Sequence, residues 1–291
     1  MNLQVALAAI FFGAMGPMAR TTGVGPASIV CITSLAVAMC HLHSDAVLQL
    51  ACADRRPLRV DIAFAVAWLY AVTKICLAIA YVHLPSSTAL PMFFLWVPLT
   101  ELYEVWRGKH LELRDSVRMV CVVLGVLILA TSDAALPDNR LRATAMVAVV
   151  MAAAATAVRM SLLRESTGLL TAQQKTAVQN SLVGAAAAAV MLVKPSLISA
   201  VPARALLLWV AYGLGLYVAY LSLFQGFEEA NVANTAYSLL LELLTAVCFG
   251  VFILGEIRMA VFTNIAGVRL PLRKIAGLGL VTVATTLGAA A

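Results

Sequence analysis

The chain has few charged residues, and this scarcity excludes several classes of protein. Only 12% of the 291 residues are charged, 20 Lys and Arg and 14 Asp and Glu, whereas 63% are hydrophobic. A soluble domain contains about 25% charged and roughly 45–50% apolar residues. So few charges cannot cover a water-soluble body of this size, which excludes a soluble enzyme, a disordered tail and a nucleic-acid-binding domain. We therefore expect a polytopic membrane protein whose main surroundings are the lipid bilayer, with no nucleic-acid partner.

Motifs for catalysis and metal binding are also missing from the sequence. It contains no CxxC, HExxH, GxSxG or P-loop pattern, and five of its six cysteines lie within apolar runs. His41 and His43 are two residues apart, so they would not share a helix face. We predict no catalytic residue, no metal site, no cofactor and no enzymatic activity. Without a P-loop, uphill transport would draw on a gradient of ions, with protons as a candidate, or of solute.

The apolar residues form long runs that predict membrane-spanning helices. A helix needs roughly 20 apolar residues to span a bilayer. Ten runs approach this length: 2–19, 25–42, 60–82, 86–106, 116–133, 142–161, 176–193, 204–226, 230–254 and 273–289. The runs are too long for barrel strands and do not alternate polar with apolar residues, so strands are not expected. The predicted fold class is an all-α polytopic membrane protein with ten transmembrane helices.

The basic residues of the connectors predict an orientation in the membrane. Two connectors that would lie on one side carry most of those in the first half: Arg55, Arg56, Arg59, Arg107, Lys109 and Arg114. The positive-inside rule then places the N and C termini in the cytoplasm. The alanine-rich composition favours an inner or plasma membrane. The last connector, which would lie outside, is basic as well, so the second half of the chain favours the opposite orientation.

An internal repeat accounts for basic loops on both faces. The segment HLPSSTALPMFFLWVPL from His83 is similar to EEANVANTAYSLLLELL from Glu228, and VVLGVLILATS from Val122 is similar to AGLGLVTVATT from Ala276. These pairs divide the chain into two five-helix repeats, residues 1–136 and 137–291. Because five is odd, the repeats would have opposite orientations. Such inverted repeats are typical of transporters, with the substrate site near the membrane midplane at their interface.

Two of these segments carry a resemblance to a known family. SLLLELLTAVCFGVFILGE (residues 238–256), followed by GLGLVTVATTLG in the last span, resembles the second repeat of EamA-type members of the drug/metabolite transporter superfamily. The first half contains a degraded counterpart. The resemblance implies ten helices in two inverted five-helix repeats around a central cavity. It also implies a function among exporters of amino acids and metabolites, or exchangers of nucleotide sugars and phosphorylated sugars.

Two ionisable residues lie deep within predicted spans. Counted at 1.5 Å per residue from the cytoplasmic side, Glu242 lies at about 18 Å and Lys74 at about 21 Å, so a pair between them is feasible. Polar or aromatic residues share their helix faces, Tyr70 and Tyr81 with Lys74 and Asn234 and Ser238 with Glu242. Buried charges in a membrane are functional candidates because their burial is costly. A structural ion pair between the two halves is the alternative.

Further candidates lie on other spans. Tyr220 has helical spacing with its aromatic neighbours and either lines the inner face of the eighth span or packs in the core. Glu101, Glu104 and Arg159 lie towards the cytoplasmic ends of the fourth and sixth spans. We expect them to form a gate or ion pair, or to reach the interface; two neighbouring carboxylates could also carry protons.

These features predict a secondary transporter. It would move a small polar or amphipathic metabolite, such as an amino-acid-like solute, by alternating access, with export as one open direction. An exchanger of nucleotide sugars or sugar phosphates is the alternative, and it should need two or more cations in the cavity. A non-transporting scaffold or a membrane-embedded enzyme is the alternative from another class. The expected partners are a small-molecule solute and the bilayer, in a monomer or homodimer.

Overall fold

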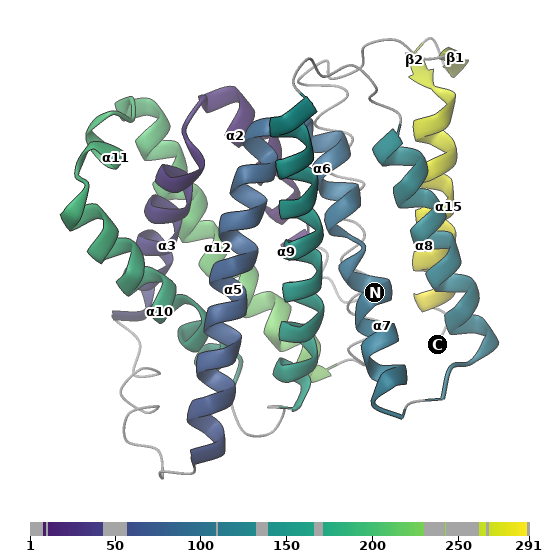
Figure 1. The fold of residues 1–291 in the computed structure, drawn as a ribbon, viewed down its shortest axis with the longest axis horizontal. Coiled ribbons are helices and arrows are strands. Elements are labelled where there is room, and N and C mark those ends of the chain that lie inside the picture. Colours follow the sequence, from purple (N-terminus) through teal and green to yellow (C-terminus); the bar gives the residue numbers. More distant parts are fainter. Residues whose placement is uncertain are drawn as a thin grey trace.

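The computed structural model describes residues 8–9, 11–42, 57–108, 110–131, 139–165, 171–229, 242, 262–265 and 268–289. Over these ranges the chain is almost entirely helical, as Figure 1 shows. The helices are α2 (Met15–Thr22), α3 (Pro26–Leu42), α5 (Pro57–His83), α6 (Ser86–Phe93), α7 (Trp96–Trp106), α8 (Leu113–Thr131), α9 (Asn139–Glu165), α10 (Ala172–Val193), α11 (Ser196–Ser199), α12 (Ala203–Glu229) and α15 (Leu272–Ala289). The strands are β1 (Phe262–Ile265) and β2 (Val268–Pro271).

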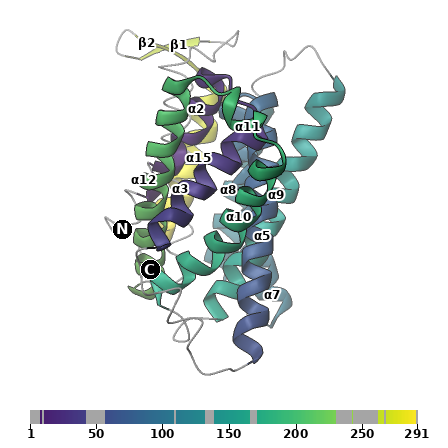
Figure 2. The same ribbon diagram turned by 90° about the vertical axis from the view of Figure 1, so that its left-hand side faces the viewer.

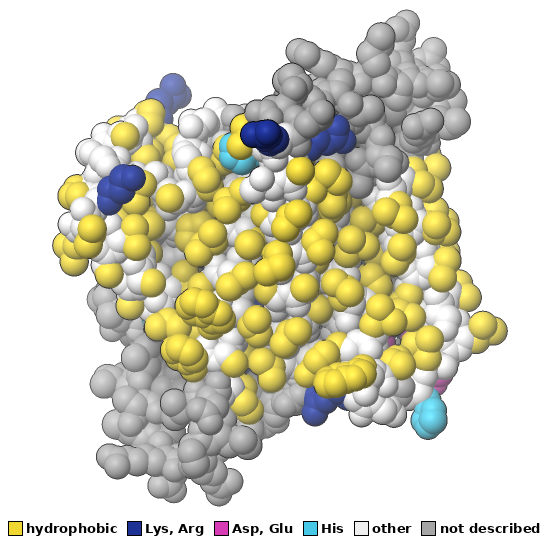
Figure 3. All heavy atoms as spheres, viewed as in Figure 1, with side chains coloured by type: hydrophobic (Ala, Val, Ile, Leu, Met, Phe, Trp, Pro, Cys, Tyr) yellow, Lys and Arg dark blue, Asp and Glu magenta, His cyan; other side chains and the backbone are white. Residues whose placement is uncertain are grey.

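The long helices have the length and composition of membrane spans. Four stretches within α5, α9, α10 and α12 are long and apolar enough to cross a bilayer: Phe64–His83, Arg140–Leu163, Ala172–Val193 and Ala203–Gly226. Large apolar side chains such as Trp68, Val147 and Val218 are exposed on their outer faces. On the face drawn in Figure 3, hydrophobic side chains cover the middle, and the few described basic side chains lie towards its upper and lower ends. These are the features of an integral, multi-pass membrane protein.

The fourth predicted span is not one uninterrupted helix. It is divided into α6 and α7 by a turn at Phe94 and Leu95. Pro98 has no N–H to donate to the carbonyl oxygen of Phe94 four residues earlier. Instead the N–H of Val97 donates to that oxygen at 3.1 Å, which tightens the turn. Proline therefore accounts for the break.

A short hairpin corrects the expectation that strands are absent. β1 and β2 pair antiparallel, with Phe262 opposite Pro271 and Ile265 opposite Val268. The hairpin lies in the connector before α15, outside the predicted spans (Figure 1). Aromatic and β-branched residues in this segment favour extended backbone.

Small residues allow the helices around α3 to approach closely. α3 packs against both α10 and α12 and lies between them in Figure 2. A Cβ atom added to Gly184 of α10 would lie 2.5 Å from Cβ of Ala38, and one added to Gly213 of α12 would lie 2.6 Å from Cβ of Ala36. Side chains larger than hydrogen would force these helices apart.

The crossing of α8 and α15 is equally close and almost wholly apolar. A Cβ atom at Gly125 would lie 2.9 Å from the carbonyl oxygen of Gly277 and 2.9 Å from Cγ2 of Val281. A Cβ atom at Gly277 would lie 2.8 Å from Cγ of Leu129. The repeat alignment pairs Gly125 with Gly279, but Gly279 is exposed and has no atom within 4 Å of such a Cβ. The structural partner of Gly125 is therefore Gly277.

Candidate functional site

The helices line a cavity near the middle of the long spans. The space open to the centres of water-sized molecules is about 80 Å³, enough for several waters or part of a small solute. The wall is formed by Phe12 and Met15 near the N terminus, Tyr70, Thr73, Lys74, Leu77 and Tyr81 of α5, Phe93 of α6, Trp96 of α7, Thr156, Arg159 and Met160 of α9, Tyr212, Leu216, Tyr220 and Leu223 of α12, and Glu242.

Helical periodicity explains why α5 supplies so much of this wall. Tyr70, Lys74, Leu77 and Tyr81 are separated by four, three and four residues, which places them along one face of the helix. The lining residues of α12 follow a similar spacing. α5 and α12 therefore each present one polar and aromatic face to the cavity and an apolar face to their outer surroundings.

Two buried cations share one end of the cavity. Nζ of Lys74 lies 5.1 Å from the ring centroid of Tyr70, and Cζ of Arg159 lies 5.0 Å from the same centroid. Lys74 also donates a hydrogen bond to Oγ of Ser34 at 3.2 Å. Lys74 and Arg159 are 5% and 4% exposed, and Nε and Nη1 of Arg159 have no hydrogen-bond partner among the described groups. Cation–π contacts compensate these charges only in part.

Glu242 lies in a different part of the wall. Its carboxylate interacts electrostatically with Tyr81, Tyr212 and Tyr220. Within the described part of the chain, no ion pair joins Glu242 to Lys74. The Lys74–Glu242 pair, which similar depths in the membrane made feasible, is therefore not formed in this structure. Two residues at the same depth can still lie on helix faces that do not meet.

Ring contacts and a hydroxyl pair hold the wall in place. Tyr220 meets the ring of Tyr70 edge-on at 5.5 Å between centroids and that of Phe12 at 5.0 Å. The hydroxyl groups of Thr73 and Thr156 share a hydrogen bond of 3.1 Å, which links α5 to α9. These contacts give the tyrosines defined positions around the cavity.

Five of the residues predicted to bind solute line the cavity: Lys74, Glu242, Tyr70, Tyr81 and Tyr220. Asn234 and Ser238 lie outside the described residues.

The three residues predicted to form a gate or ion pair are not brought together in the cavity wall. Arg159 lines the cavity, whereas Glu101 and Glu104 of α7 are not among its lining residues. Glu101 is buried and Glu104 half-buried elsewhere. α9 continues to Glu165, so Arg159 lies about 9 Å from the helix end rather than beside it.

The prediction omitted several wall residues, notably Thr73, Thr156 and Tyr212. For two of them, Thr156 and Tyr212, helical spacing in the sequence indicates the same position in the wall. Thr156 lies three residues before Arg159, and Tyr212 lies two helical turns before Tyr220, so each shares a face with a residue that was considered.

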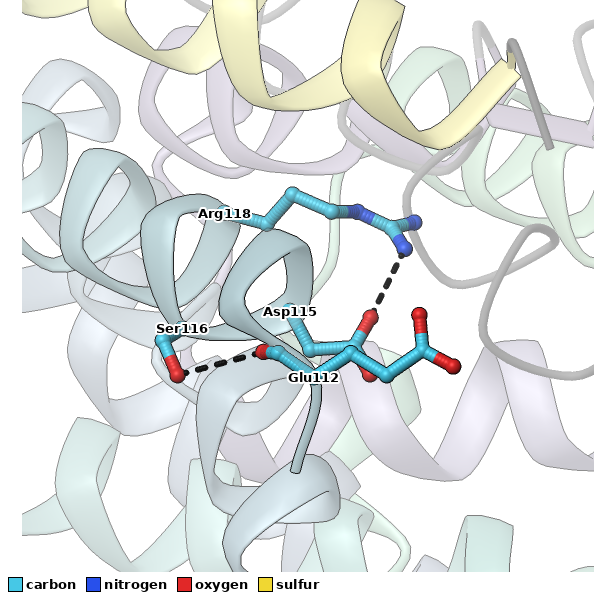
Figure 4. Close-up of polar contacts among 4 residues, drawn as sticks. All are labelled: Glu112, Asp115, Ser116 and Arg118. Carbon is cyan, nitrogen blue, oxygen red and sulfur yellow. Dashed lines mark hydrogen bonds and ion pairs between the residues drawn. The ribbon is translucent and has the colours of Figure 1, made fainter. Parts of the chain in front are cut away.

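A polar contact of another kind lies at the start of α8, outside the cavity wall. Nη1 of Arg118 lies 3.3 Å from Oδ1 of Asp115, and Oγ of Ser116 donates to the carbonyl oxygen of Glu112 at 3.2 Å (Figure 4). Both contacts join residues one turn apart, so they order the helix start. No group of His, Cys, Asp and Glu that could hold a metal ion occurs among the described residues.

Comparisons with known proteins bear on the fold alone. No protein-family model and no curated protein matches the chain. Seventeen chains of solved structures match it. One, described as "Crystal structure of protein", aligns with a TM-score of 0.69 at 14% identity, covering 99% of this chain and 97% of that chain. The whole chain is thus similar in fold to a known structure.

Proposed function

We propose that the protein is a secondary transporter that moves a small polar or amphipathic solute by alternating access. The observation that carries this proposal is the cavity that gathers Lys74, Arg159 and Glu242 inside apolar helices. Ionisable residues within a membrane are costly, and they are typical of substrate and ion pathways. A buried site among spans also suits a solute that must be shielded from lipid.

We also propose that the chain consists of two inverted five-helix repeats, residues 1–136 and 137–291, as in EamA-type transporters. The cavity wall supports this division. The third and eighth predicted spans contribute through α5 and α12, and the first and sixth through Phe12, Met15 and α9. The fourth and ninth contribute through α6, α7 and Glu242. Every contributing span thus has its counterpart five spans away.

The packing of the helices gives independent support for the repeat. α3 packs on α10, and α8 on α15, so each of these helices meets its own counterpart. The contact of α3 with α12 has an equivalent in the contact of α5 with α10. At the α8–α15 crossing, Gly125 approaches Val281 as Gly277 approaches Leu129, with one constant offset between the paired residues. Reciprocal contacts of this kind are expected of a two-fold relation, and the colours of Figure 1 show α8 and α15 running in opposite directions, as inverted repeats require.

An exchanger of nucleotide sugars or sugar phosphates is the second candidate. It is favoured by the presence of two cations, Lys74 and Arg159, in the cavity wall. We rank it second because Glu242 shares that wall and would repel a phosphate, and because bulky aromatic residues restrict the space. A scaffold is less well supported, since it would have no need of a polar cavity.

The proposal is tested by reconstituting the purified protein in proteoliposomes with a panel of amino acids, organic acids, amines and sugar phosphates. We expect uptake or efflux of at least one of them. Lys74→Met and Glu242→Gln should each reduce transport while leaving the yield of folded protein unchanged, and Lys194→Met, at an exposed position, serves as the matched control. No transport of any compound, with or without a proton gradient, would contradict the proposal, and normal transport by both variants would remove these residues from the site.

A further inference from the structure

The cavity has two electrostatically different ends. We infer that it holds a small zwitterion, with the anionic group against Arg159 and Lys74 and the cationic group towards Glu242. This inference rests on the proposed function, since it names the class of solute and its orientation in the same site.

At the first end, two positive charges lie close together, and no anion among the described residues pairs with them. Arg159 and Lys74 repel one another and share the ring of Tyr70. Among the described residues, the one hydrogen-bond acceptor next to them is a neutral hydroxyl, that of Ser34, which accepts from Lys74. Two N–H groups of Arg159 have no partner among the described residues, although the side chain is 4% exposed. A carboxylate from the solute would supply the missing acceptor, and guanidinium binds carboxylate with two parallel hydrogen bonds.

At the second end, a carboxylate lies among tyrosines. The electrostatic neighbours of Glu242 are Tyr81, Tyr212 and Tyr220, and no described Lys or Arg forms an ion pair with it. A solute ammonium would pair with the carboxylate and could contact the ring faces of the tyrosines, which attract cations. The second end therefore attracts a positive charge on the solute, whereas the first end attracts a negative charge.

Tyr220 connects the two ends of the wall. Its ring meets that of Tyr70, which lies near both cations, at 5.5 Å between centroids, and it interacts electrostatically with Arg159 and Glu242. The space of about 80 Å³ limits the solute to a small one, so both charges should lie on one small molecule. Phe12, Phe93 and Trp96 also line the cavity and would surround an apolar or aromatic side group.

Binding of matched compounds to the purified full-length protein tests this assignment. Three series share a methyl, isobutyl or benzyl group. Each contains the zwitterion (alanine, leucine or phenylalanine), its analogue without the amine (propanoate, 4-methylpentanoate or 3-phenylpropanoate) and its analogue without the carboxylate (ethylamine, 3-methylbutylamine or 2-phenylethylamine). In at least one series we expect the zwitterion to bind about tenfold tighter than either analogue, by calorimetry. Equal or tighter binding of an analogue or of glucose 6-phosphate, or no binding in all three series, would overturn the inference.

Two variants test the orientation by a readout that a structural role would not give. Arg159→Gln should weaken the zwitterion and the anionic analogue about tenfold or more and leave the amine unchanged. Glu242→Gln should weaken the zwitterion and the amine and leave the anion unchanged, while Lys194→Gln changes none of them. Equal losses for all three compounds in both variants would overturn the assignment of ends.

The failure of this inference can be distinguished from failure of the transport proposal. If the protein binds a zwitterion with the expected charge selectivity but does not move it across proteoliposome membranes, the two-ended site is supported and the transport proposal is contradicted. If it transports a solute that carries one charge or none, the transport proposal is supported and the two-ended site is contradicted.

Discussion

The α8–α15 crossing and the cavity wall show two ways in which the same apolar helices meet. At the crossing, Gly125 and Gly277 bring two backbones together, and the neighbouring side chains are apolar. In the cavity wall, tyrosines, Lys74 and Arg159 occupy the faces that would otherwise pack. Helices in lipid associate through close packing of small residues. Bulky polar residues keep them apart, so the first place is a structural contact, and the second leaves the space in which we propose a solute site.

The largest effect is expected from filling the crossing. Gly125→Val adds atoms where even a Cβ would lie 2.9 Å from the Gly277 carbonyl oxygen, so the helices must separate. Overpacking of this kind costs about 1–3 kcal/mol or more. We expect a marked fall in thermal stability and in folded yield in detergent. Gly279→Val is the matched control on an open position, and equal stability of the two variants would show that the crossing is not tightly packed.

Removing a charge from the cavity wall should reduce transport without reducing stability. Arg159→Met relieves the repulsion between two buried cations and leaves a shorter, unbranched apolar side chain in place. The melting temperature should stay the same or rise, because buried charges cost desolvation energy. Transport in proteoliposomes should fall about tenfold or more, as expected for a lost charged hydrogen bond. Loss of folded protein with unchanged specific transport would assign Arg159 to the structure instead.

A smaller effect is expected from a hydrogen bond that joins two helices within the cavity wall. Thr73 and Thr156 join α5 to α9 by one hydrogen bond of 3.1 Å beside the cavity. A double-mutant cycle with Thr73→Val and Thr156→Val should give a coupling energy of about 0.6 kcal/mol, the average for interhelical hydrogen bonds in a membrane. Reversible unfolding in detergent measures it. Strict additivity of the two substitutions would show that the bond does not link the helices.

The smallest effect is expected at the start of α8. Asp115→Asn removes the negative charge from the contact with Arg118, but the amide oxygen of Asn can still accept the hydrogen bond from Nη1. Ion pairs between residues one turn apart on a helix contribute about 0.2–0.5 kcal/mol. Stability should therefore change little and transport not at all. A loss of transport in this variant would mean that the site extends beyond the cavity wall.

The sequence was sufficient to predict a largely helical membrane protein but not the arrangement of the site. Apolar periodicity and length predict the long helices, and the depth of Lys74 within its span predicts that it is a site residue, in agreement with its place in the cavity wall. The break between α6 and α7 depends on the position of Pro98 within its turn. The position of Arg159 depends on how far α9 extends. The separation of Lys74 from Glu242 depends on the lateral packing of helices, which periodicity along one helix does not contain.

Labelling of single cysteines from each side of the membrane tests the central claim without knowledge of the solute. In a variant without the six native cysteines, Leu216→Cys places a thiol in the cavity wall and Val218→Cys places one on the exposed outer face of the same helix, α12. If the protein is an alternating-access transporter, a membrane-impermeant methanethiosulfonate should label Leu216→Cys from either side of oriented vesicles and Val218→Cys from neither. Labelling of Leu216→Cys from one side only, or from neither side, would contradict the account.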